Sequence, residues 1–125
     1  MQSRGGVPQT IEFEYGAKGH WIGNKNARNV LIWYHVSFNV RPLRYPTQLI
    51  QSVEGLRYIL TETNRTPANI LLGGDSAGGN LAVGVLSHLS SPHEAIAKLD
   101  VQEPLAGTVL IAPWTSLEYC SFKLV

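Results

Sequence analysis

Apolar and polar residues alternate near the start of the chain, and further on the apolar residues gather into short runs separated by turn-rich segments. Ile11, Phe13 and Tyr15 alternate with two glutamates, which predicts a half-buried strand with these three side chains on one face. A turn-rich stretch, 16–29, is expected to follow. The uninterrupted apolar run 30–34 then predicts a strand that is covered on both faces and lies centrally in a sheet.

The rest of the chain alternates helical periodicity with short apolar runs. Leu49, Val53, Leu56 and Leu60 recur at spacings of four, three and four, so they share one stripe of a helix. In chain order the pattern predicts a helix from Pro46 or Thr47 to about Thr63, a buried strand at 70–72, a helix at 77–89, a loop at 90–104 and a buried strand at 108–111.

This alternation of strands and helices is typical of an α/β protein with a parallel sheet and right-handed crossovers. The chain has 125 residues, of which 44% are apolar and 15% charged, a balance typical of one globular domain. A complete doubly wound sheet usually needs a longer chain. We therefore predict a single incomplete domain, 1–125, built on a partial doubly wound parallel sheet.

Charge and cysteine content argue against several kinds of site. The formal net charge is +1, with no basic stripe and no acidic tail, so a nucleic-acid partner is not expected. Cys120 is the only cysteine, which excludes an intramolecular disulfide and a thiolate-rich metal site. No apolar run approaches the roughly 18 residues that span a bilayer, so we expect a soluble chain without a transmembrane segment. The sequence does not identify the compartment, and a cytoplasmic location is a working hypothesis.

One motif suggests chemistry: Gly74-Asp75-Ser76-Ala77-Gly78 matches the pattern G-x-S-x-G. In this pattern a sharp turn from a strand into a helix lifts a serine hydroxyl above the carboxyl edge of a sheet, and the glycines leave room for the strained turn. The predicted strand before the motif and the predicted helix after it fit that context. The alternative is a glycine-rich turn that binds phosphate, but it lacks both the P-loop lysine and the G-x-G-x-x-G spacing of a dinucleotide site.

A nucleophilic serine needs a base within hydrogen-bond reach and an acidic group that orients the base. No acidic residue after Ser76 is followed by a histidine, although that chain order accompanies the motif. His88 is twelve residues along the predicted helix and thus roughly 18 Å away, so His88 and His93 are predicted to be a helix-surface and a loop histidine. His35 follows a strand at the edge where Ser76 should emerge, so we expect it to line the site and regard it as the candidate for a substitute base.

The stretch 73–81, with the sequence GGDSAGGNL, resembles the elbow of the hormone-sensitive-lipase-like branch of α/β-hydrolases, and the resemblance extends over about 6–117. It implies the α/β-hydrolase fold and esterase or lipase-like hydrolysis of a small-molecule carboxylic ester through an acyl-Ser76 intermediate. It also implies that the backbone N–H of Ala77 is one oxyanion donor, and that neither a cofactor nor a metal is needed. Weaker similarities lie at His20–Gly23, Val30–His35, Tyr45–Pro46 and Ala112–Trp114.

The chain departs from the family pattern in three ways. The family's H-G-G-G loop is His35-Val36-Ser37-Phe38 here, and loss of an oxyanion donor can cost on the order of a hundredfold in rate. The segment 37–42 resembles one that follows a further helix in the family. A crossover is therefore expected to be missing after His35, because parallel neighbours need a connection of about a dozen residues. The chain also ends before the catalytic Asp and His of the family would appear.

Two hypotheses follow from these departures. The chain is either an ester hydrolase that uses Ser76, or a catalytically inactive truncated fragment that acts, if at all, by binding an acyl ligand or a partner. Missing strands are also expected to leave apolar sheet edges exposed, which favours association between chains.

Overall fold

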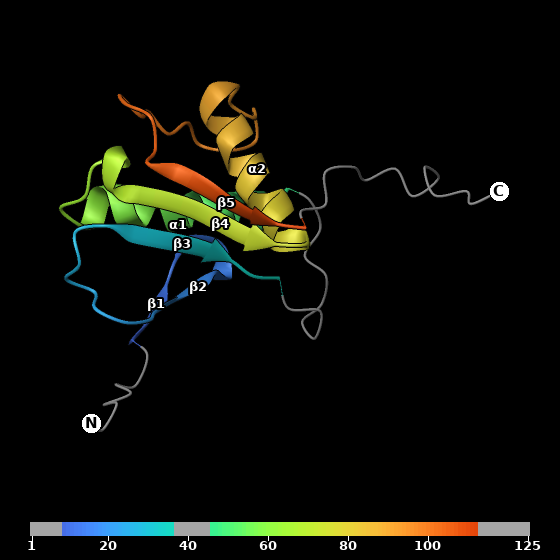
Figure 1. The fold of residues 1–125 in the computed structure, drawn as a ribbon. Helices are drawn as coiled ribbons and strands as arrows, with labels where there is room; N and C mark the ends of the chain where they lie inside the picture. Colours follow the sequence, from blue (N-terminus) through green and yellow to red (C-terminus); the bar gives the residue numbers. More distant parts are fainter. Residues whose placement is uncertain (1–8, 37–45, 113–125) are drawn as a thin grey trace.

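The computed structural model describes residues 9–36 and 46–112. Within these ranges a short antiparallel hairpin stands beside a three-stranded parallel sheet, and two helices pack against the sheet (Figure 1). The hairpin strands are β1 (Gln9–Glu12) and β2 (Lys18–Trp21), the sheet strands are β3 (Val30–Tyr34), β4 (Ile70–Asp75) and β5 (Gly107–Ile111), the helices are α1 (Thr47–Glu62) and α2 (Ala77–Ser90), and two 3-10 turns cover Glu14–Gly16 and Pro67–Asn69.

The parallel sheet and both predicted helices are confirmed. The strand order is β3-β4-β5, and both pairings are parallel, with Val30 opposite Ile70 and Leu72 opposite Thr108. Successive strands are joined through α1 and through α2, as parallel neighbours require. The predicted absence of a crossover after His35 concerns residues 37–42, which lie outside the described residues.

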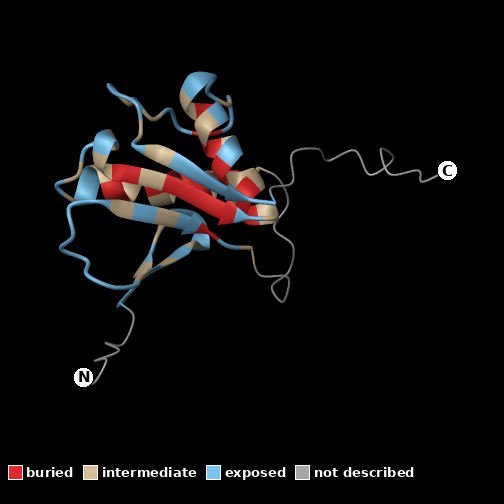
Figure 2. Ribbon diagram, viewed as in Figure 1, coloured by how far each residue is buried: buried red, intermediate tan, exposed pale blue. Residues whose placement is uncertain are grey.

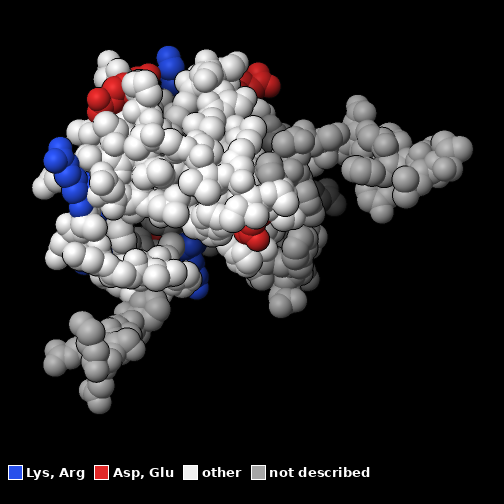
Figure 3. Space-filling model, viewed as in Figure 1, with Lys and Arg blue, Asp and Glu red and all other residues white. Residues whose placement is uncertain are grey.

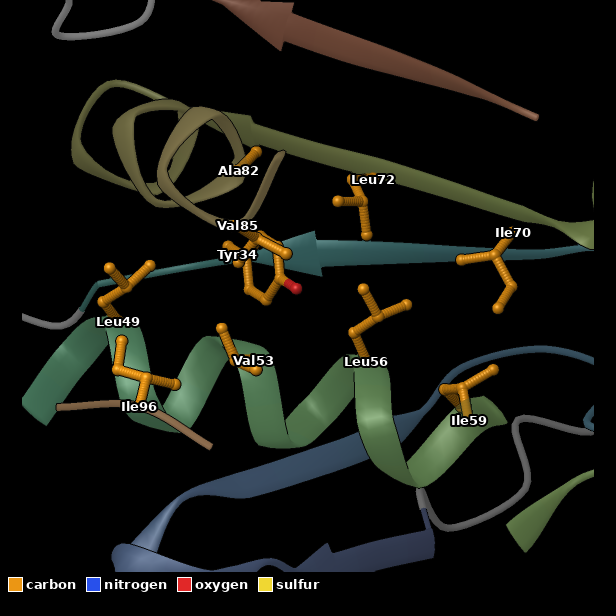
Figure 4. Packing of buried hydrophobic residues seen from close by; sticks show 10 residues of the cluster. All are labelled: Tyr34, Leu49, Val53, Leu56, Ile59, Ile70, Leu72, Ala82, Val85 and Ile96. Carbon is orange, nitrogen blue, oxygen red and sulfur yellow. The ribbon is translucent and has the colours of Figure 1, made fainter. Parts of the chain in front are cut away.

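The core lies on one face of the sheet, because both helices pack there. Alternate residues of a strand point to the same face, and Tyr34, Ile70 and Leu72 are the buried apolar side chains of β3 and β4 on the helix side. The buried side chains of α1 face these residues (Figure 4). The last of them is Ile59 and not Leu60, which the sequence pattern had placed in the stripe. The buried apolar residues are Tyr34, Leu49, Val53, Leu56, Ile59, Ile70, Leu72, Ala82, Val85 and Ile96.

The opposite face of the sheet is open among the described residues (Figure 2). Leu31 and Trp33 of β3 are 49% and 40% exposed, and Val109 and Ile111 of β5 are 42% and 55% exposed. The prediction that 30–34 is a central, doubly covered strand is therefore wrong for the described residues, and so is the prediction that 108–111 is buried. Within residues 9–36 and 46–112, β3 and β5 are the two edge strands of the sheet. Their apolar runs supply side chains to both faces of the sheet, and in these ranges only one face is packed.

The N-terminal hairpin differs from its prediction. Strand β1 ends at Glu12, and Tyr15 sits in a 3-10 turn with φ 63°, where its side chain is 61% exposed. Only Ile11 and Phe13 are half-buried, and the Phe13 ring packs edge-on against Tyr58 of α1. The predicted turn-rich stretch contains β2, whose lysine, glycine and histidine gave no strand signal.

Candidate active site

Ser76 joins β4 to α2 in a strained backbone conformation. Its φ is 52° and its ψ is −118°, a region that a residue with a Cβ rarely adopts. The Ser76 N–H donates to the Ile111 carbonyl oxygen over 3.0 Å, and the Ser76 carbonyl accepts the Asn80 N–H over 3.2 Å. The turn is therefore held by β5 on one side and by the first turn of α2 on the other.

Two glycines of the motif are required by close packing. A Cβ added to Gly74 would lie 2.3 Å from the carbonyl carbon of Gly78. A Cβ added to Gly78 would lie 2.0 Å from the Tyr34 carbonyl oxygen at the end of β3. The spacing G-x-S-x-G thus lets α2 start directly against β3 and β4, which keeps Ser76 at the carboxyl edge of the sheet.

Ala77 begins α2, so its N–H is one of the helix amides that lack an intrahelical acceptor. Such amides and the helix dipole stabilise negative charge near the N-terminus of a helix. Asp75, the last residue of β4, is exposed beside them. Oxyanion stabilisation is therefore chemically available next to Ser76.

His35 lies at the same edge of the sheet. Tyr34 is opposite Gly74 in the parallel register, so His35 comes level with Asp75. Its Cα lies 3.6 Å from the position that a Cβ on Gly78 would take. The sequence placed His35 beside the elbow, and the structure brings the two together. Its side chain is exposed, and no hydrogen bond joins it to Ser76.

The other histidines are engaged elsewhere. The His20 imidazole is hydrogen-bonded to the Thr10 hydroxyl. His88 is only 2% exposed, which corrects its prediction as a helix-surface residue: it continues the inner face of α2, where Nε2 lies 3.3 Å from the Ala97 carbonyl and Nδ1 accepts the His93 N–H. His93 lies in the loop after α2, as predicted. Across the described ranges, the Ser76 hydroxyl has no hydrogen-bonded imidazole.

Tyr34 packs against both helices, and the sequence pattern did not identify it as a residue of the site. Its hydroxyl donates to the Ser52 carbonyl of α1 over 2.9 Å, while its own carbonyl oxygen contacts Gly78. Burial raises the pKa of the Tyr34 phenol well above its ordinary value, because the ionised form would lose its hydration. Tyr34 ties β3 to both helices, and only its position at the end of an apolar run hinted at such a role.

Residues 9–36 and 46–112 contain no group of three or more His, Cys, Asp or Glu side chains that is arranged to hold a metal. Neither helix in these ranges has the length and apolar character needed to cross a bilayer.

A comparison with known protein families gave a match. Residues 31–123 match the sequence model of a family described as alpha/beta hydrolase fold. A search of curated proteins found no match. The matched range contains β3 except for its first residue, Val30, together with β4, β5, both helices and the turn at Ser76.

Proposed function

Because the chain belongs to the alpha/beta hydrolase fold family, of the hormone-sensitive-lipase-like type, we propose that it carries the nucleophile of a serine carboxylic-ester hydrolase. The observation that supports this most directly is the positive φ of Ser76 between β4 and α2. Strain of this kind concentrates at functional sites, where surrounding packing maintains it.

In the proposed reaction, Ser76 Oγ forms a bond to the carbonyl carbon of the ester. The alcohol then leaves with a proton, which gives an acyl-Ser76 intermediate, and water later releases the acid. The negative charge that develops on the carbonyl oxygen would be stabilised by the Ala77 N–H at the start of α2. Gly74 and Gly78 hold this geometry, and Asp75 and His35 line the edge around it.

The described residues place no base in hydrogen-bond contact with Ser76. Serine without a base stays protonated, and acyl transfer then falls by several orders of magnitude. None of the four histidines is bonded to Ser76 within the described residues. This observation favours a second candidate function for the 125-residue chain by itself, which is ligand or partner binding without turnover.

Two measurements on the purified chain and a Ser76→Ala variant test both candidates. We expect equal steady-state rates of p-nitrophenyl acetate hydrolysis for the two proteins after each is confirmed to be folded. We also expect a fluorophosphonate to modify Ser76 slowly, and faster at alkaline pH, because hydroxide replaces the missing base. Intact-mass and peptide analysis would locate the adduct.

The outcomes show whether Ser76 is the reactive residue and whether a base assists it. Equal modification of the chain and of Ser76→Ala would exclude Ser76 as the reactive residue. A hydrolysis rate that exceeds that of Ser76→Ala and is abolished by fluorophosphonate would mean that a base is present, and His35→Ala should then remove the excess.

A further inference from the structure

Two strained residues lie at the carboxyl edge of the sheet. In the part of the chain that the structure describes, three residues other than glycine have a positive φ: Tyr15 at 63°, Ser76 at 52° and Ala112 at 41°. Tyr15 belongs to the turn between β1 and β2, whereas Ser76 and Ala112 directly follow β4 and β5. They come level because Asp75 is opposite Ile111 in the parallel register. In Figure 1 the arrowheads of β4 and β5 end next to each other, beside the first turn of α2.

The local sequence does not account for the conformation of Ala112. A positive φ crowds the Cβ of every residue except glycine, and a residue that precedes proline, as Ala112 precedes Pro113, normally adopts an extended conformation. The Ala112 side chain is exposed, so packing of its methyl group does not hold it either. Strain of this kind persists where the surrounding structure imposes it. The backbone contacts beside Ala112 therefore have to supply the reason.

One backbone hydrogen bond connects the two strained residues. The Ser76 N–H donates over 3.0 Å to the carbonyl oxygen of the peptide group that joins Ile111 to Ala112. Because a peptide group is planar, that carbonyl changes direction only by rotation about ψ of Ile111 or φ of Ala112. The Ser76 N–H belongs in turn to the peptide group from which φ of Ser76 projects its side chain. The hydrogen bond thus links the φ of Ala112 to the direction of the Ser76 hydroxyl.

We propose that Ala112 is a positioning residue for Ser76. Its positive φ keeps the Ile111 carbonyl directed at the Ser76 N–H, and this hydrogen bond holds the turn from the side of β5 while close packing of α2 holds it from the other side. The importance of the position for chemistry rests on the proposed function. The coupling between the two residues is a property of the fold alone, so it can be measured separately.

Three variants isolate the φ of residue 112. Proline fixes φ near −65°, so Ala112→Pro requires a rotation of roughly 100° from the observed 41°. It also keeps the preceding residue extended, as Ile111 in β5 already is. Ala112→Gly is the conservative variant, because glycine adopts a positive φ without steric cost. Tyr15→Pro is the matched control, since it makes the same change at an exposed positive-φ residue of the N-terminal hairpin.

The decisive measurement is hydrogen exchange of the Ser76 amide in the 125-residue chain, divided by that of the Leu72 amide in β4 to remove effects of global stability. We expect this ratio to rise about tenfold in Ala112→Pro, as for the loss of one hydrogen bond, and to stay unchanged in Ala112→Gly and Tyr15→Pro. The fluorophosphonate reaction of Ser76 at alkaline pH should slow by about tenfold in Ala112→Pro alone. If Ala112→Pro does not fold, Ala112→Val replaces it, because a β-branched residue is strongly disfavoured at positive φ.

Two results would overturn the proposal. An unchanged exchange ratio in Ala112→Pro would mean that the chain after Ala112 takes up the rotation and the Ile111 carbonyl stays in place. An equal rise in Tyr15→Pro would mean that the effect is not specific to the edge of the sheet. A ratio that rises in Ala112→Pro, with no fluorophosphonate adduct on Ser76 in any variant, would contradict the proposed nucleophile and retain Ala112 as a positioning residue of the turn.

Discussion

At the scale of single residues, the turn at Ser76 depends on glycines, which have only a hydrogen atom where other amino acids have a Cβ. The tightest contact is between Gly78 and the Tyr34 carbonyl oxygen, where an added Cβ would lie 2.0 Å away. The obstacle is backbone, which cannot rotate aside as a flexible side chain can. Ser76 keeps its strained φ because α2 is packed this closely against β3.

Gly78→Ala should therefore destabilise the protein by about 3 kcal/mol or more, since α2 must move away from β3. The same substitution at Gly55, where the space is open, should stabilise the protein by roughly 0.5–1 kcal/mol through helix propensity. Urea unfolding of the two variants measures both effects. Equal effects of the two substitutions would contradict the packing argument.

Tyr34→Phe tests the buried phenol. At neutral pH we expect a loss of about 1 kcal/mol, because the hydrogen bond to the Ser52 carbonyl is removed. The pKa of Tyr34 is higher in the folded than in the unfolded protein, so its contribution is complete below about pH 10, the unfolded value, and is lost as the pH rises toward the folded value.

The free energy of unfolding of the unmodified protein should thus fall relative to Tyr34→Phe by up to about 1.4 kcal/mol per pH unit above about pH 10. Urea titrations of both proteins at neutral and alkaline pH give this difference. A difference that stays constant across that range would mean that Tyr34 ionises as readily in the folded state.

At the scale of elements, α1 holds the loop that follows α2. The Arg57 guanidinium donates to the Ala97 carbonyl over 2.8 Å and to the Lys98 carbonyl over 3.2 Å, while its Nε bonds Glu54 over 3.1 Å. This planar group fixes the segment that contains the buried Ile96. The loop between α2 and β5 is therefore anchored to the core although it has no regular structure.

Arg57→Lys should loosen this loop, because an ammonium group cannot reach both carbonyls and the carboxylate. We expect a loss of about 1 kcal/mol in stability and faster amide hydrogen exchange at 93–99. Lys98→Gln is the control, since the Lys98 side chain is 70% exposed in its ion pair with Asp100 and such pairs contribute little. Similar exchange rates in both variants would assign the anchoring to Ile96 alone.

At the scale of the whole molecule, one face of the parallel sheet lacks a covering layer in the described residues. In the view onto this face, most charged side chains lie toward the margins (Figure 3). Trp33 lies across Gly73, with Val109 on the neighbouring strand at the same level. Parallel sheets are normally covered on both faces, so this surface should favour association between chains.

Val109→Lys should reduce that association severalfold, because it places a charge on the apolar face and at an edge strand. Val83→Lys on α2 is the matched control, as Val83 is 38% and Val109 42% exposed, and it should leave association unchanged. Sedimentation velocity over a range of concentrations gives the comparison. Equal effects would mean that net charge, not this face, controls association.

The sequence by itself determined the order of the two helices and of the three strands of the parallel sheet, and the position of Ser76 at the turn, because periodicity and the G-x-S-x-G spacing are local properties. It also placed His35 at the right edge. It did not predict β2. Only the tertiary structure decided that both helices share one face, that His88 is buried and that Tyr34 supports the elbow. The physical reason is that an apolar pattern shows which side of an element needs cover, whereas the element that provides the cover comes from a distant part of the chain.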